Sequence, residues 1–199
     1  MSVRTLVVVA LVAALVGCGD RANAPSTESP FKATDISGVD WGRDFHLTDH
    51  TGQPRSMADF KGKVVLLFFG YTHCPDVCPT TLAEMAQVRA KLGADAQRVQ
   101  GLFVTVDPRR DTPQLLARYV PAFDSSFLGL FADSEATAAL ASEFKIYYAA
   151  QPADAQGNYT VDHTGAVYVF DPAGRLRLLM RPGTGIDAMA ADVRLLLKG

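Results

Sequence analysis

The chain alternates continuous apolar runs with segments whose apolar residues recur at helical spacing. The runs Val64 to Phe69 (VVLLFF) and Gly101 to Val106 (GLFVTV) are short and β-prone, which is typical of strands buried on both faces. A helical pattern follows each run, near Thr80 to Leu92 and near Thr112 to Tyr119. Strands that alternate with helices in this way predict an α/β fold with parallel strands.

The second half of the domain repeats this pattern and ends in a hairpin and a helix. An apolar run from Phe127 to Phe131 precedes a predicted helix near Glu135 to Phe144. Val167 to Phe170 and Leu176 to Met180 flank a turn with Pro and Gly, and Asp187 to Leu197 has the period of an amphipathic helix. We therefore expect an α/β sandwich whose central mixed β-sheet is flanked by helices.

The first 17 residues have the features of an export signal. Arg4 precedes an eleven-residue apolar run, Leu6 to Val16, which is shorter than the roughly 20 residues of a membrane-spanning helix. The run ends in Leu-Val-Gly-Cys18, which resembles the lipobox of bacterial lipoproteins. We expect residues 1–17 to be a lipoprotein signal peptide and Cys18 to carry the lipid. An ordinary cleaved signal peptide, with Cys18 as a spare thiol, is the alternative.

Lipidation at Cys18 would place the protein in the bacterial cell envelope, anchored to a membrane and facing the periplasm. Residues 18–37 are small, polar and Pro-containing, which predicts a flexible lipidated tether. Residues 38–199 then form one domain, and the alternation in residues 45–52 (FHLTDHTG) predicts an N-terminal hairpin. The net charge of −2, without a basic cluster, argues against a nucleic-acid partner.

Two cysteines follow the first buried strand, at the edge of the sheet where α/β proteins collect functional groups. Pro79 is tolerated in a first helical turn, so we expect Cys78 at the helix start and Cys74 in the preceding turn. Free N–H groups at a helix N-terminus lower a thiol pKa. The pair indicates disulfide exchange or soft-metal binding, because a structural disulfide closing so short a loop stabilises little.

Three segments together resemble the Sco/SenC family: residues 70–82 (GYTHCPDVCPTTL), 104–113 (VTVDPRRDTP) and 161–164 (VDHT). The resemblance covers residues 38–199 and implies a thioredoxin-like fold. It also implies a membrane-tethered copper protein that helps to assemble the CuA centre of cytochrome c oxidase, with Cys74, Cys78 and His163 as the copper ligands. The implied partners are the oxidase subunit that carries CuA, a periplasmic copper donor and a thiol reductant.

The implied ligand set suits copper chemically. Two thiolates suit Cu(I), and an imidazole also accommodates Cu(II), so one site can hold both oxidation states. A closed structural zinc site normally has four protein ligands, and only three candidates are present here. The alternative function is a thiol-disulfide oxidoreductase that reduces the cysteines of a copper acceptor, so an enzymatic activity stays open. Thioredoxins usually carry a cis-proline before the corresponding strand, and the absence of proline from Tyr159 to Phe170 favours the ligand role.

Three polar residues near these motifs have simpler interpretations. We expect His73 to orient the cysteine loop, because consecutive side chains usually point apart and Cys74 already faces the site. Asp107, which precedes a proline, predicts a turn, and Asp111, which precedes Thr112-Pro113, predicts a helix cap.

Overall fold

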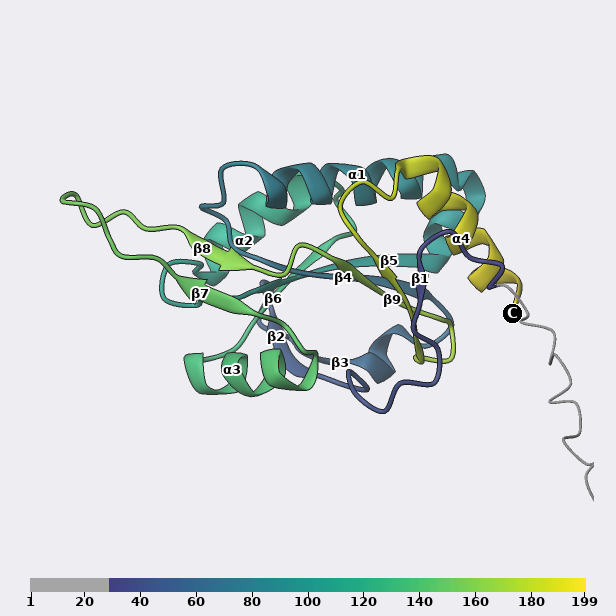
Figure 1. Ribbon diagram of the computed structural model, residues 1–199, viewed down its shortest axis with the longest axis horizontal. Coiled ribbons are helices and arrows are strands. Elements are labelled where there is room, and N and C mark those ends of the chain that lie inside the picture. Colours follow the sequence, from purple (N-terminus) through teal and green to yellow (C-terminus); the bar gives the residue numbers. More distant parts are fainter. Residues whose placement is uncertain (1–28) are drawn as a thin grey trace, which may run out of the picture.

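An eight-stranded mixed sheet forms the centre of the structure, a computed structural model that describes residues 29–199 (Figure 1). The strand order is β1-β10-β9-β4-β5-β6-β2-β3. The strands are β1 (Thr34–Asp35), β2 (His46–Asp49), β3 (Pro54–Ser56), β4 (Val64–Gly70), β5 (Val99–Thr105), β6 (Leu128–Phe131), β9 (Val167–Phe170) and β10 (Leu176–Met180). The predicted signal peptide and the lipid on Cys18 lie outside the described residues.

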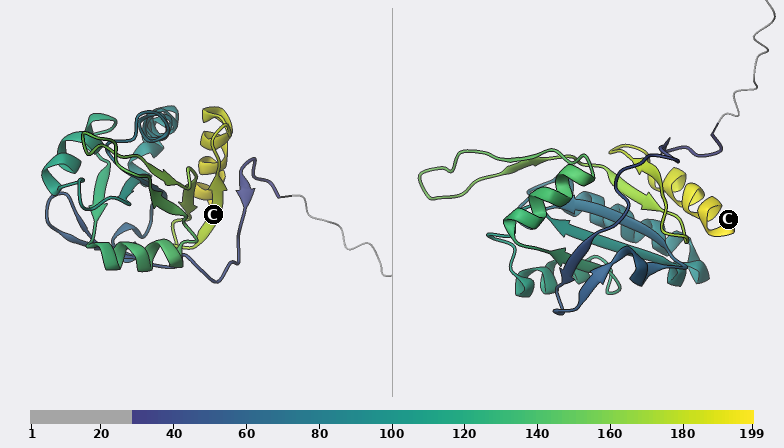
Figure 2. Two further views of the ribbon diagram at one scale, coloured as in Figure 1. Left: turned by 60° about the vertical axis from the view of Figure 1, so that its left-hand side comes forward. Right: turned by 90° about the horizontal axis from the view of Figure 1, so that it is seen from below.

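Helices cover both faces of the sheet. They are α1 (Val77–Lys91), α2 (Pro113–Tyr119), α3 (Ser134–Glu143) and α4 (Ile186–Lys198). Helices α1 and α4 lie on one face and α3 on the other, as the two views in Figure 2 show. The predicted α/β sandwich, with its mixed sheet and its N-terminal β2–β3 hairpin, is confirmed. Within residues 29–199, every helix is too short or too polar to cross a membrane.

The two central strands place the cysteine loop. Strands β4 and β5 are parallel, in register from Val64 opposite Val99 to Gly70 opposite Thr105, and every residue of both is buried. The loop after β4 and the loop after β5 therefore leave the sheet at the same edge. A hydrogen bond from the Val106 N–H to the Gly70 carbonyl oxygen, 2.8 Å long, joins the two loops where they begin.

A second, two-stranded sheet was not predicted from the sequence. Strands β7 (Tyr148–Ala150) and β8 (Val161–His163) pair antiparallel, with Tyr148 opposite His163. Residues 148–163, called the arm below, project from the body of the domain (Figure 1). Residues 151–158 at its tip are exposed, and such a segment has no apolar alternation for a sequence pattern to detect.

The ordered domain begins before residue 38, where the sequence pattern predicted its start. Strand β1 pairs antiparallel with β10. The carboxylate of Asp192 in α4 is fully buried and accepts hydrogen bonds of 2.8 to 3.1 Å from the backbone N–H groups of Lys32 and Ala33. The predicted flexible tether therefore does not extend to residue 37, because a distant helix holds residues that have no local pattern of their own.

A buried carboxylate in the N-terminal hairpin makes the fold sensitive to acid. Asp49 is fully buried, and burial opposes its ionisation. Hydrogen bonds from Thr51, Arg55 and the backbone N–H of Gln53 outweigh that effect and lower the pKa of Asp49 from 3.8 to about 2. The ionised carboxylate therefore contributes stability above pH 4, and this contribution is lost as the pH falls toward 2.

We expect Asp49→Asn to lower the free energy of unfolding by about 2 kcal/mol at pH 7 and to remove most of its decline between pH 4 and pH 2. Urea unfolding across this pH range measures both effects. Asp95→Asn is the matched control, because the Asp95 side chain is 54% exposed and pairs only with exposed Arg98. An Asp49→Asn variant that keeps the acid sensitivity of the wild type would contradict the prediction.

Candidate metal centre

Three side chains from separate parts of the chain meet beyond the end of β4. Cys74 lies in the loop after β4, Cys78 in the first turn of α1, and His163 is the last residue of β8. Their ligand atoms all lie within 4.8 Å of one another, and Cys78 Sγ lies 3.3 Å from His163 Nε2. Sulfur and nitrogen bind a metal ion at about 2.0 to 2.3 Å, so ligands of one ion lie no more than about 4.6 Å apart. The three atoms thus need only small movements to share one ion.

The two thiols have different surroundings. Cys78 is fully buried and Cys74 is partly exposed, and both are free thiols. The Cys78 backbone N–H, in the first turn of α1, donates a hydrogen bond to Cys74 Sγ at 3.4 Å. Burial raises the pKa of the Cys78 thiol far above its ordinary value. For Cys78, the expectation that the helix N-terminus lowers the thiol pKa is wrong, because desolvation of the thiolate dominates.

His163 presents an unprotonated nitrogen to the sulfurs. Its Nδ1 lies 3.1 Å from the carbonyl oxygen of Thr164, which can only accept a hydrogen bond, so Nδ1 carries the proton and Nε2 the lone pair. Burial lowers the pKa of His163 below its ordinary value, and the ring is neutral at pH 7. Phe68 and Tyr71 pack edge-on against it, with ring centroids 5.9 and 5.8 Å away. The ring is therefore held in a form that is ready to bind a metal.

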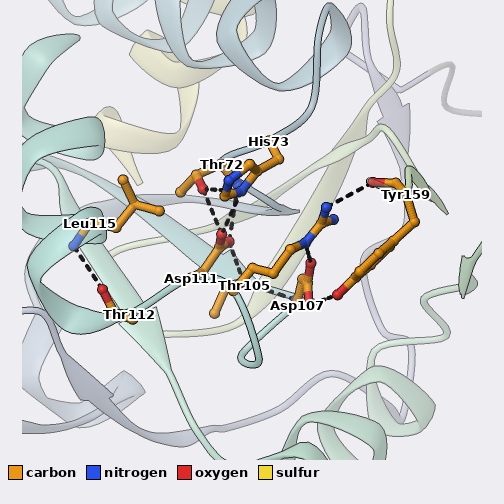
Figure 3. A network of polar contacts seen from close by, with 9 residues as sticks. Thr72, His73, Thr105, Asp107, Asp111, Thr112, Leu115 and Tyr159 are labelled. Atoms are coloured by element: carbon orange, nitrogen blue, oxygen red, sulfur yellow. Dashed lines mark hydrogen bonds and ion pairs between the residues drawn. The ribbon is translucent and has the colours of Figure 1, made fainter. Parts of the chain in front are cut away.

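Asp111 connects the cysteine loop to β5. Its buried carboxylate accepts hydrogen bonds from the Thr72 N–H at 3.0 Å, the Thr72 hydroxyl at 2.6 Å and the Thr105 hydroxyl at 2.6 Å (Figure 3). The prediction that Asp111 caps a helix is wrong. Thr112 is the N-cap of α2, and its hydroxyl accepts from the Leu115 N–H. The side chain of Asp111 instead points inward, where its carboxylate accepts hydrogen bonds from three donors on Thr72 and Thr105.

His73 lies beside the site but not in it. Its Nδ1 is 3.1 Å from the Thr72 hydroxyl and 3.7 Å from the Asp111 carboxylate, as Figure 3 shows. Among the described residues, the group able to share a metal consists of Cys74, Cys78 and His163. The position of His73 agrees with the expected role in orienting the loop.

Sequence reasoning missed one cluster next to the site. The predicted turn at Asp107 is present, since its carbonyl oxygen accepts from the N–H groups of Arg110 and Asp111. The Asp107 side chain has a further role, because its carboxylate accepts hydrogen bonds from the side chains of Arg110 and Tyr159. Arg110 lies within a segment that the family resemblance singled out, but Tyr159 is 49 residues away in the arm, and no local pattern connects the two.

The fold and the site together define a class. A cysteine pair at the junction of a central strand and the N-terminus of a helix, in a mixed sheet with helices on both faces, is the arrangement of a thioredoxin-like protein. Here an imidazole completes the pair as a third donor. Residues 33–198 match the SCO1/SenC family model, and the chain belongs to the SCO1/SenC family.

Individual relatives agree with this membership. The chain is 47% identical to the mouse protein called "Protein SCO2 homolog, mitochondrial" over 133 residues, which is 66% of this chain and 52% of the mouse protein. The matched part thus spans about half the length of that relative. Bradyrhizobium japonicum ScoI with copper bound superposes with a TM-score of 0.71 at 38% identity, covering 77% of this chain and 97% of that one. Apo Sco1 from Thermus thermophilus gives 0.74 at 43% identity, with coverages of 83% and 96%.

Proposed function

We propose that this protein binds copper through Cys74, Cys78 and His163 and delivers it during assembly of the CuA centre of cytochrome c oxidase. The observation that carries the proposal is the convergence of two sulfurs and one imidazole nitrogen within 4.8 Å. A relative in the same family was solved with copper bound. The three residues are those to which the family resemblance assigns the ligands.

The donor set suits transfer of the metal as well as binding. Two thiolates favour soft Cu(I), and the imidazole extends the site to Cu(II). Three protein ligands leave a coordination position open for a group from an acceptor. Cys74 is partly exposed, so a partner protein that approaches the site reaches this sulfur first.

The proposal includes attachment to the bacterial cell envelope through lipid on Cys18, with the domain facing the periplasm. Its support is the lipobox-like segment that ends at Cys18. The described chain begins beside β1 and α4, and the arm that carries His163 projects on the opposite side of the domain (Figure 1). A tether attached at residue 29 would therefore leave the metal site free to meet a partner.

The cysteine pair also supports a second function, reduction of a disulfide in the copper acceptor. Both thiols are free, and the partly exposed Cys74 sulfur accepts a hydrogen bond from the Cys78 backbone N–H. Attack by Cys74 on an acceptor disulfide would form a mixed disulfide, which Cys78 would then resolve. The acceptor gains two electrons and two protons, the pair becomes a disulfide, and a thiol reductant in the envelope restores it.

Titration of the reduced protein with Cu(I) and Cu(II) under anaerobic conditions tests the proposal. We expect one copper per chain. In His163→Ala, Cu(II) affinity should fall by on the order of 100-fold or more, since loss of an outer-sphere partner alone costs roughly 10- to 100-fold. Cu(I), which keeps both thiolates, should lose less.

His46→Ala is the matched control and should bind both ions as the wild type does, because His46 lies outside the ligand group and its side chain, in the β2–β3 hairpin, is 84% exposed. Cu(II) binding that is tight in His163→Ala would refute the ligand assignment. Rapid disulfide reduction by a protein that takes up no copper would establish the second function instead.

A further inference from the structure

His163 reaches the cysteines from an element that is separate from the main sheet. Within residues 29–199, β7 and β8 pair with each other and form a sheet separate from the main one, and the tip of the arm is exposed. The position of the imidazole relative to the two sulfurs therefore depends on how the arm is fastened to the body of the domain. Its contacts near His163 include one with Tyr71 and one with a cluster of Asp107, Arg110 and Tyr159.

The inner contact is Tyr71. Its ring packs at 90° against that of His163, with the ring centroids 5.8 Å apart. Tyr71 is buried and immediately follows β4. This contact holds the last residue of β8 but does not reach the residues that lead into the strand.

The outer contact is a closed cluster of Arg110, Asp107 and Tyr159. Arg110 Nη1 donates to the carbonyl oxygen of Tyr159 at 2.8 Å, and Arg110 Nε donates to the Asp107 carboxylate. The Tyr159 hydroxyl donates to the other oxygen of that carboxylate at 3.0 Å, as Figure 3 shows. The guanidinium carbon lies 3.5 Å from the centroid of the Tyr159 ring. We call these three residues the latch.

The latch is well placed to resist opening. The Asp107 side chain is 5% exposed and that of Arg110 is 20% exposed, so water and salt screen their ion pair less than one at the surface. Tyr159 lies only four residues before His163. Arg110 also lies 5.6 Å from the centroid of Tyr71, and the outer and inner contacts are therefore adjacent.

We propose that Arg110 is a positioning residue for the metal site: by latching the arm through Tyr159 and Asp107, it holds His163 Nε2 within reach of the two sulfurs. The effect on copper binding rests on the proposed function. The fastening of the arm by Arg110 does not depend on that function. Arginine is required because one planar group makes two directed hydrogen bonds and stacks on an aromatic ring, which a lysine ammonium does not do.

Opening of the latch should weaken copper binding selectively. If loss of the latch left the arm docked about one tenth of the time, a His-dependent ion would bind about ten-fold more weakly. Cu(II) relies on the imidazole more than Cu(I) does. We therefore expect about a ten-fold loss of Cu(II) affinity in Arg110→Lys and a smaller loss for Cu(I).

The experiment combines amide hydrogen exchange on the metal-free protein with copper titration. In Arg110→Lys, exchange at residues 159–163 should accelerate about ten-fold while β4 and β5 remain protected, because only local opening is increased. The Cu(II) electron paramagnetic resonance spectrum should lose part of its nitrogen hyperfine coupling. Arg109→Lys is the matched control, since Arg109 is exposed and has no part in the latch, and it should resemble the wild type.

Tyr159→Phe provides an independent variant, because it removes only the hydroxyl that binds Asp107. If Arg110→Lys does not fold, Tyr159→Phe tests whether the latch holds the arm. It should shift exchange in the arm in the same direction by a smaller factor. Wild-type exchange at residues 159–163 in both variants would overturn the latch. A wild-type protein that binds no copper would overturn the proposed function, and the exchange data would still decide whether the arm is latched.

Discussion

Cys78→Ser should lose copper binding almost completely, by more than the roughly 10- to 100-fold that loss of an outer-sphere partner costs. The serine hydroxyl is a hard donor that stays protonated, so it does not replace a thiolate toward Cu(I). Cys78 Sγ also lies 3.3 Å from His163 Nε2, and its loss leaves only two of the three grouped donors, Cys74 and His163. Competition titration against a chromophoric Cu(I) chelator measures the affinity.

The surroundings of Cys78 predict that copper uptake releases protons. Burial raises the pKa of this thiol, so it is protonated at pH 7 and must lose its proton to bind the metal. His163, whose pKa burial lowers, has no proton on Nε2 to lose. Copper affinity should therefore rise with pH between pH 6 and pH 8. Calorimetry in buffers of different ionisation enthalpy counts the released protons, and wild type should release at least one proton for each copper ion bound.

Cys18→Ser, in protein produced without residues 1–17 so that Cys18 carries no lipid, is the matched control, because Cys18 is not one of the three proposed ligands. Copper affinity and proton release should be unchanged in this variant. If Cys18→Ser bound copper as poorly as Cys78→Ser, Cys18 would be needed for binding and the proposed ligand set would be wrong. Wild-type copper affinity in Cys78→Ser would likewise contradict a site made by Cys74, Cys78 and His163.

Gly70→Ala should be the most damaging single-methyl change near the site. A Cβ at Gly70 would lie 2.7 Å from Cys78 Sγ and 2.8 Å from Phe103 Cε2, and both side chains are fully buried. Extra volume in a packed core costs about 1 to 3 kcal/mol. We expect the upper end, about 3 kcal/mol in the free energy of unfolding, because neither neighbour has room to move.

The same methyl group should also impair the metal site. Cys78 Sγ can move away from it only by shifting the ligand relative to Cys74 and His163. We therefore expect Cu(I) affinity to fall even at temperatures where the variant is folded. Denaturant unfolding and chelator competition on the same preparation separate the two effects.

Gly165→Ala is the control for Gly70→Ala. Its added Cβ would be 3.4 Å from Val77 and 3.5 Å from Pro182, which is ordinary contact. Its stability should change by less than about 0.5 kcal/mol, with copper affinity retained. Equal effects of the two variants would show that the close approach at Gly70 carries no special cost.

Much of the architecture follows from local pattern. The run from Val64 to Phe69 predicts a strand buried on both faces, and β4 is buried throughout because it has neighbours on both sides in the sheet and helices above and below. Pro79 places Cys78 in the first turn of α1, as the structure has it. These inferences succeed because strand burial and the start of a helix depend on residues that are adjacent in the chain.

Other features depend on residues that are far apart. The buried Asp111 has the local setting of a helix cap but binds Thr72, 39 residues earlier. The arm has no apolar alternation, and its place depends on Arg110, 49 residues before Tyr159. The thiol of Cys78 has the helix position that lowers a pKa, yet its burial by the surrounding core raises it.

By itself, the sequence determined the alternation of strands and helices, the position of Cys78 at the start of α1 with Cys74 in the preceding loop, and, through its motifs, the family with its expected third ligand. Only the tertiary structure decided that His163, 85 residues after Cys78, returns to 3.3 Å from its sulfur. It also decided which thiol is buried and what holds the arm in place. The physical reason is that hydrophobic period and turn chemistry act over a few residues, whereas desolvation and ligand geometry are set by whatever the folded chain brings alongside.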